Sequence, residues 1–196
     1  MIKAVVFDLD GTITKPFLNF QEIRLEIGVS QGRESLLDQI ESMGEDERQR
    51  ALEVLARHEE AAAKNAELNR GVRELLDYIA ARGLAAAVVT RNSDKSTRRV
   101  LDMLDVRVER VITRDSDLAV KPDPESLFYL AEEWGIEPTE ILMVGDHPYD
   151  IQYGRAVDAV TCLVTNGRDH DRTCMPDHQV EVPGDVIEIL ESLIGR

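Results

Sequence analysis

The chain is poor in cysteine and in long apolar runs, and both scarcities limit what it is. Its 196 residues include only two cysteines, Cys162 and Cys174, so no disulfide framework supports the fold and a reducing compartment is expected. No stretch approaches the roughly 18 consecutive apolar residues of a membrane-spanning helix. The N-terminal stretch "MIKAVVFDLD" also lacks the apolar centre of a secretory signal. We therefore expect a cytoplasmic protein.

Basic residues are scarce relative to acidic ones. The chain has 23 Lys and Arg against 38 Asp and Glu, which gives a formal net charge of −15. This excess of negative charge disfavours a nucleic-acid surface or a basic membrane patch, so we expect neither nucleic acid nor membrane among the partners. With 43% hydrophobic residues, the composition is that of a soluble globular domain with a sizeable core and room for a small insertion.

Apolar runs alternate with amphipathic segments along most of the chain. Buried strands are predicted at 2–7, 84–90, 108–113, 140–145 and 160–165. Helices are predicted before, between and after the later strands, at 71–83, 94–105, 123–135, 149–157 and 184–195. Near-continuous apolar strands that alternate with helices predict an α/β fold, a doubly wound parallel sheet covered on both faces.

One segment interrupts this alternation. Residues 16–69 carry no strand signal and are rich in strong helix formers. Apolar residues recur at helical spacing within 30–43 and again within 45–68. We expect a helical hairpin that forms a small all-α cap, 16–69, inserted into an α/β core made of 1–15 and 70–196. The alternative is that this segment simply packs as part of the core.

Polar side chains stand where the predicted strands end. Asp8 follows "VVF", Thr90 follows "AVV", Asp146 follows "LMVG", and Lys121 lies a short loop beyond the third strand. Ligands of open parallel sheets bind beyond the carboxyl ends of the strands, so we expect these side chains to converge on one site. Carboxylates hold a hard cation, while a lysine and a hydroxyl hold an anion beside it. One carboxylate can act as a nucleophile and another as general acid and base.

Asp8 and Asp10 are separated by one residue and directly precede Gly11. Residues i and i+2 of a strand point the same way, so both carboxylates are expected to face the site. Two like charges this close are costly. A divalent cation offsets the repulsion, and a raised pKa of Asp10 lets it serve as an acid. Gly11 permits a sharp backbone turn directly after the two carboxylates.

The stretches "FDLDGTIT", "VVTRN", "VKPDPE" and "MVGDHPYD" resemble, in order and at strand ends, the four motifs of the haloacid dehalogenase superfamily. The pattern is most similar to the phosphoglycolate-phosphatase-like branch, whose cap is inserted between the first two motifs. The resemblance covers nearly the whole chain, with the cap poorest in motif. It implies a Rossmann-like core and a Mg²⁺-dependent phosphatase that hydrolyses small phosphate monoesters through an aspartyl-phosphate.

The resemblance also implies roles for individual residues. Asp8 is the expected nucleophile, and Asp10 protonates the leaving oxygen and then deprotonates water. Thr90 hydrogen-bonds the phosphoryl group, and Lys121 neutralises charge between nucleophile and phosphate. The expected Mg²⁺ ligands are Asp8, the backbone carbonyl of Asp10, and Asp146, with support from Asp150.

The second motif departs from the family pattern, because Arg91 intervenes between Thr90 and Asn92. We expect Arg91 and Asn92 to bind substrate together with Thr90 and Lys121, although Arg91 as a solvated loop residue stays open. His147 either touches the leaving group or packs in its loop.

Several alternatives stay open for the whole chain. Asp10 disfavours a dehalogenase, which lacks that residue in the family pattern. A phosphomutase or a pyrophosphatase of the same superfamily remains possible, as does a non-enzymatic binding or regulatory module. The expected partner is a small phosphorylated metabolite, and the expected assembly is a monomer or weak homodimer.

A second metal site is not expected. The stretch 168–178 groups four potential ligands, but their spacing matches no zinc pattern. They are His170, Asp171, Cys174 and His178.

Overall fold

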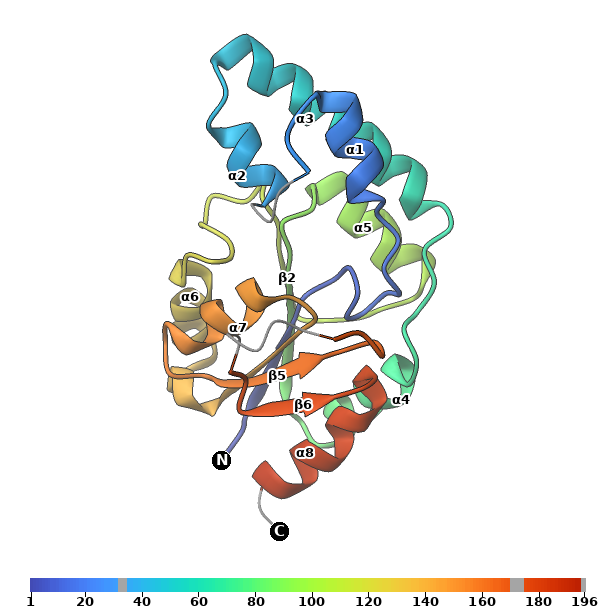
Figure 1. Cartoon of the computed structure of the whole chain (residues 1–196). Coiled ribbons are helices and arrows are strands. Elements are labelled where there is room, and N and C mark those ends of the chain that lie inside the picture. The colour runs from blue at the N-terminus through green and yellow to red at the C-terminus, as the bar shows by residue number, and fades with distance from the viewer. Residues whose placement is uncertain (32–34, 170–174, 195–196) are drawn as a thin grey trace.

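The computed structural model of the chain describes residues 1–31, 35–169 and 175–194. Within these residues, six parallel strands form one sheet in the order β3-β2-β1-β4-β5-β6 (Figure 1). The strands are β1 (Ala4–Phe7), β2 (Ala85–Val89), β3 (Arg110–Ile112), β4 (Ile141–Gly145), β5 (Val160–Val164) and β6 (His178–Val180). The predicted doubly wound α/β fold is confirmed.

Helices cover both faces of the sheet because the strands are apolar on both sides. Side chains alternate along β1, so Val5 and Phe7 join one buried cluster while Ala4 and Val6 join another. The first cluster includes side chains from α4 (Val72–Ala81), α5 (Asp94–Met103) and α8 (Val186–Leu193). The second includes side chains from α6 (Glu125–Trp134) and α7 (Pro148–Arg155). Two short 3₁₀ helices, Pro138–Glu140 and Pro183–Asp185, precede β4 and α8.

The sixth strand was not predicted from the sequence. β6 is three residues long, "HQV", and pairs only with β5. Because it lies at the sheet edge, it is only partly buried and carries no apolar run. The other strands match the predicted runs to within a few residues at each end.

The inserted segment holds three helices and not the two of the expected hairpin. They are α1 (Phe20–Ile27), α2 (Leu36–Glu41) and α3 (Glu45–Ala63). The unforeseen helix α1 had a signal in the sequence, since Asn19 caps its first turn and Ile23 and Ile27 share a helical spacing.

The three helices share a small apolar cluster of their own, separate from the two clusters on the sheet. It contains Ile23, Leu36, Ile40, Ala51 and Leu55. Figure 1 shows the helices gathered at one end of the molecule, beyond the sheet. We propose to treat 16–69 as a cap on that basis and call it the cap below. In the described part of the chain, no helix is both long and apolar enough to cross a membrane.

Candidate active site

The site forms where the strand order reverses. β1 and β4 are neighbours in register, with Phe7 beside Val144, so the residues that follow them emerge together. The chain continues after β1 into Asp8 and after β4 into Asp146. Single carboxylate oxygens of Asp8, Asp146 and Asp150 all lie within 4.8 Å of one another. Residues far apart in sequence therefore converge at the carboxyl edge of the sheet, as predicted.

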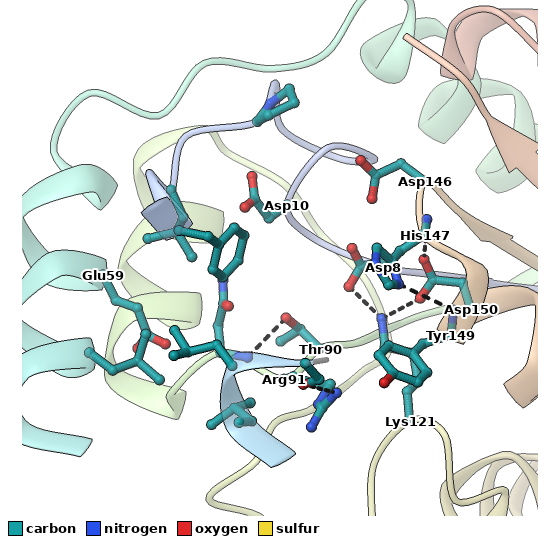
Figure 2. Close-up of a pocket in the computed structure, with 18 of the residues that line it drawn as sticks. Asp8, Asp10, Glu59, Thr90, Arg91, Lys121, Asp146, His147, Tyr149 and Asp150 are labelled. Atoms are coloured by element: carbon teal, nitrogen blue, oxygen red, sulfur yellow. Dashed lines mark hydrogen bonds and ion pairs between the residues drawn. The ribbon is translucent and has the colours of Figure 1, made fainter. Parts of the chain in front are cut away.

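Lys121 is the cation at the centre of this acidic group. Its Nζ pairs with Oδ1 of Asp8 and, at 2.7 Å, with Oδ1 of Asp150. Figure 2 shows both interactions, with Asp146 and Thr90 nearby. The lysine side chain is only 3% exposed. A buried ammonium in contact with two carboxylates is held as a fixed positive charge, and the nearby Asp150 and Asp8 charges raise the pKa of Lys121 against the effect of burial.

Burial disfavours the charged form of the aspartates around Lys121. Burial raises the pKa of Asp8 to about 6, against the lowering effect of Lys121. Burial also raises the pKa of Asp10 to about 7 and that of Asp146 to about 8, the latter reinforced by the charges of Asp8 and Asp150. One lysine does not balance this charge. The oxygen-only donor set fits Mg²⁺, which prefers carboxylate ligands.

Two glycines make the close approach of the acids possible. Gly11 has φ +84°, and a Cβ at that position would lie 2.1 Å from Oδ2 of Asp146. A Cβ on Gly145 would lie 2.2 Å from the carboxyl carbon of Asp150. Neither position has room for a side chain while the carboxylates stay in place, so glycine is required by space at both and by φ at Gly11 as well.

Two asparagines hold the turn after β1, and the sequence analysis missed both. Nδ2 of Asn69 donates to the Gly11 carbonyl oxygen at 3.1 Å, and Nδ2 of Asn166 donates to the same oxygen at 2.7 Å. Asn69 also donates to Oδ1 of Asn166 at 2.8 Å. A further backbone contact fixes Asp10, whose Oδ1 accepts from the Phe17 amide at 2.9 Å. Neither asparagine lies in a motif, so no local signal indicated its role.

Thr90 and Asn92 end β2 beside this group. The Thr90 amide donates to the Ile112 carbonyl of β3 at 2.9 Å, which fixes the residue at the strand end. Thr90 Oγ1 accepts a hydrogen bond from the backbone amide of Asn92 at 3.2 Å. Nδ2 of Asn92 is buried and has no hydrogen-bond acceptor among the described residues, yet Asn92 lines the cavity. This side-chain amide of Asn92 is therefore a donor available to an oxygen of a bound ligand.

A cavity of about 400 Å³ stands over the acidic group. Its floor is the polar group just described. Its opposite wall comes from the cap and is largely apolar, with Leu18, Phe20, Leu36, Leu37 and Leu55. Arg24 of α1 and Arg168 after β5 also line it. Arg168, which the sequence analysis did not single out, lowers the pKa of Asp10 and of Asp146 against larger raising effects.

A buried glutamate joins the cap to the core, and it too was missed. The Glu59 side chain in α3 is 1% exposed and pairs with Arg114, which follows β3. It also accepts from the Ser93 hydroxyl at 2.6 Å and from the Ser93 amide at 3.2 Å. Glu59 lines the cavity, but these bonds give it a structural task.

The two residues with open alternatives are both engaged within the protein. Arg91 lines the cavity and donates to Ser35 and Asp38 of the cap, so it is not a solvated loop residue. His147 caps α7: its ring Nδ1 accepts from the Tyr149 amide at 3.3 Å, and its own amide donates to Oδ2 of Asp150 at 2.9 Å. These bonds support the packing role for His147. The direct substrate contact expected of Arg91 stays a prediction.

No described residue of the stretch 168–178 belongs to a group that could hold a metal. His170, Asp171 and Cys174 lie outside the described residues. His178 is in β6, away from the acidic group. Within the residues described, the one cluster of His, Cys, Asp or Glu suited to a metal is that of Asp8, Asp146 and Asp150. Cys162 is buried in β5 and forms no disulfide with any described residue.

Comparison with known proteins agrees with this geometry. A family model described as haloacid dehalogenase-like hydrolase matches residues 2–158. A haloacid dehalogenase-like hydrolase domain-containing protein of Arabidopsis thaliana is 29% identical over 83% of this chain and 71% of its own length. A phosphoglycolate phosphatase of Pseudomonas savastanoi pv. phaseolicola is 25% identical over 98% of this chain and 78% of its own length.

Solved structures extend the likeness to the whole fold. The crystal structure of a hydrolase from Pseudomonas syringae has a TM-score of 0.82 and covers 97% of this chain and 99% of its own. At 20% sequence identity, that likeness concerns the fold alone. Since the family model spans all the motif residues from Asp8 to Asp150, the chain belongs to the haloacid dehalogenase-like hydrolases.

Proposed function

We propose that the chain is a Mg²⁺-dependent phosphatase that hydrolyses small phosphate monoesters through an aspartyl-phosphate on Asp8. The observation that carries the proposal is buried Lys121, paired with Asp8 and Asp150 beside Asp146. The relative named phosphoglycolate phosphatase supports a phosphatase, while the identity of the ester stays open. A small phosphorylated metabolite as substrate suits a cavity of about 400 Å³.

Asp8, Asp146 and Asp150 would hold the metal. When bound, Mg²⁺ supplies positive charge to the phosphoryl oxygens and keeps these carboxylates ionised. Lys121 supplies a second positive charge from the protein itself. Its contact with Asp8 orients the nucleophilic oxygen, and a phosphoryl oxygen next to Asp8 lies within its reach. The Thr90 hydroxyl and the side-chain amide of Asn92 are the proposed donors on the other side.

The reaction has two steps. An Oδ of Asp8 bonds to phosphorus while the bond from phosphorus to the ester oxygen breaks, and Asp10 gives its proton to that departing oxygen. Asp10 then takes a proton from a water molecule whose oxygen bonds to phosphorus, and the bond from phosphorus to Asp8 breaks. Free phosphate leaves, and both carboxyl groups return to their first state. The pKa of Asp10, raised to about 7 by burial, suits a group that must give and take a proton near neutral pH.

Hydrolysis of p-nitrophenyl phosphate tests the proposal. Purified protein should release nitrophenol and inorganic phosphate in equal amounts with Mg²⁺, lose activity with EDTA, and regain it when Mg²⁺ is restored. Full activity after chelation would contradict the metal assignment. Isomerisation of a sugar phosphate without phosphate release would instead favour a phosphomutase.

A further inference from the structure

A second hollow, of about 620 Å³, adjoins the active-site cavity. It lies between α2 of the cap and the loop that connects β3 to α6. Its lining mixes polar and apolar residues, and it includes Asp117 and Asp123 from that loop. Three residues line both hollows: Leu37, Arg91 and Lys121. These three therefore form the wall between them.

Of the three, only Arg91 belongs to the core and is also held by hydrogen bonds to described residues of the cap. Lys121 is fixed in the active site by Asp8 and Asp150. Leu37 belongs to α2 itself. Arg91 extends from the end of β2 to α2, where Nη1 donates to Ser35 Oγ at 2.8 Å and Nη2 donates to Asp38 Oδ1 at 2.5 Å.

A tyrosine completes this arrangement. The guanidinium of Arg91 lies 5.4 Å from the centre of the Tyr149 ring, within the range of a cation–π contact. Tyr149 Oη donates to the second oxygen of Asp38 at 3.1 Å. Asp38 thus binds residues that follow two different strands, β2 and β4, and Figure 2 shows Arg91 and Tyr149 at the same side of the cavity.

The position of Arg91 therefore depends on a contact that solvent reaches. The Asp38 side chain is 45% exposed, whereas that of Arg91 is 17% exposed. An exposed ion pair is weakly held, so the pair can open without unfolding the protein. Once it opens, Arg91 loses its charged partner Asp38, and the Ser35 hydroxyl and the Tyr149 ring are the described contacts that still hold it across the gap between the two hollows.

We propose that Arg91, positioned by Asp38, is a partition that sets the largest leaving group the active site accepts. This inference rests on the proposed phosphatase function and adds a substrate class to it. Esters whose alcohol part fits the first cavity are turned over with the partition closed. Esters with a longer alcohol part extend into the second hollow and require Arg91 to move.

Two phosphate esters that differ mainly in length test the partition. Phenyl phosphate and 4-biphenylyl phosphate carry the same charge and release phenols of similar acidity. Asp38→Ala should raise the ratio of kcat/KM for 4-biphenylyl phosphate to that for phenyl phosphate by about tenfold, because the longer group no longer displaces a held arginine. Asp38→Glu, which can keep the ion pair, should leave the ratio near that of the wild type.

A matched control removes another bond between cap and core. Glu60 of α3 pairs with Lys95 of α5 at 2.9 Å, and neither residue lines either hollow. Glu60→Ala should leave the ratio unchanged. Thermal unfolding of each variant checks the fold, and Asp38→Asn replaces Asp38→Ala if the latter does not fold.

The outcomes separate this inference from the function on which it rests. An unchanged ratio in folded Asp38→Ala overturns the partition while phosphatase activity stands. 4-Carboxyphenyl phosphate is assayed as a third ester. If Asp38→Ala raises kcat/KM for this ester alone, the partition is also overturned, since Arg91 would then be a receptor for an anion on the substrate. Calorimetric binding of phenylphosphonate and 4-biphenylphosphonate gives a readout without turnover. If the protein shows no phosphatase activity but Asp38→Ala still shifts the ratio of the two binding constants, the partition stands and the proposed function is overturned.

Discussion

At the scale of single residues, the lack of a side chain at two glycines is as important to the site as its charged groups. Gly11 and Gly145 each stand where a Cβ would occupy a carboxylate of the site. Gly11 also turns the chain with φ +84° directly after Asp10. The acidic motif therefore works only because the backbone beside it carries no side chain, which is a requirement of geometry and not of charge.

Replacing Gly11 should damage the site more than the fold. We expect Gly11→Ala to lower kcat/KM by about tenfold or more, because Asp146 must move away from a Cβ placed 2.1 Å from its Oδ2. Gly83→Ala is the matched control, since Gly83 has φ +65° but a Cβ added there would meet no atom within 4 Å. That control should lose only about 1 kcal/mol of stability from backbone strain and keep its activity. Equal activity of the two variants would contradict the role given to Gly11.

The sequence predicted the residues that converge on the candidate site and missed those that hold the turn beside them. Asp8, Thr90, Lys121 and Asp146 each follow or lie near a strand end, and the sheet brings strand ends together whatever the details of packing. Asn69 is the last residue of the cap, and its partner Asn166 follows β5. Their meeting at the Gly11 carbonyl depends on how two distant loops pack, and no local pattern carries that information.

At the scale of elements, α3 connects the cap to the core through a buried ion pair. Glu59 pairs with Arg114 and accepts two hydrogen bonds from Ser93. Glu60, one residue later, makes only exposed ion pairs with Lys95 and Arg99. Adjacent glutamates on one helix thus have very different surroundings, which helical periodicity explains after the fact.

Removing the buried charge should be far more costly than removing its neighbour. Glu59→Gln leaves Arg114 without its carboxylate, and we expect it to lower the free energy of unfolding by about 3 kcal/mol. Glu60→Gln should lower it far less, since exposed pairs contribute little. Urea unfolding of both variants measures the difference. Similar losses in the two would show that Glu59 is not an anchor.

A carboxylate helps to attach the start of strand β6 to β5. Oδ2 of Asp177 accepts from the Thr161 amide at 2.8 Å and from the Thr161 hydroxyl at 2.7 Å. Partial burial alone would raise the pKa of Asp177, but these hydrogen bonds outweigh it and lower the pKa below the ordinary value of 3.8.

This lowered pKa predicts a pH dependence of stability. Because the folded-state pKa is below the unfolded one, the contribution is fully present above about pH 4 and is lost as the pH falls through the folded-state pKa. Asp177→Asn removes it, so the stability difference between wild type and variant should shrink as the pH is lowered from 6 towards 3. A constant difference over that range, measured by urea unfolding, would contradict the account.

The limits of prediction at this scale follow from burial. Strands β1, β2, β4 and β5 lie inside the sheet and have continuous apolar runs, so they were predicted. The edge strand β3 was predicted as well, because its run contains Val108, Val111 and Ile112. β6 has neighbours on one side only, and α1 is short with a single buried apolar residue, Ile23. Elements that bury little surface leave a weak pattern, and tertiary contacts decide whether they form.

At the scale of the whole molecule, the cavity has a polar floor from the core and a mainly apolar wall from the cap. The floor holds the groups proposed to act on phosphorus, and the wall faces the rest of the substrate. A closed wall excludes water from the reacting groups, which strengthens the electrostatic interactions among them. Under the proposed function, the core carries out the chemistry and the cap contributes to substrate choice.

Removing the cap should therefore change substrate choice more than chemistry. We expect replacement of residues 18–62 by a short Gly/Ser linker to raise KM and alter the ranking of phosphate esters. Turnover of p-nitrophenyl phosphate should change less, since its good leaving group needs little assistance. Ala63 and Ala66 are retained because they pack in the main core. An unchanged ranking in a variant shown to be folded by circular dichroism would place selectivity in the core loops.

The most direct test of the central claim is the turnover of p-nitrophenyl phosphate by Asp8→Asn. The substitution keeps the size of the side chain and removes the nucleophilic carboxylate next to Lys121. The account predicts a fall in kcat of at least about a thousandfold at saturating Mg²⁺, with the fold retained, because the covalent path is closed. Substantial turnover by a pure variant, free of deamidation and of contaminating phosphatase, would contradict Asp8 as the nucleophile.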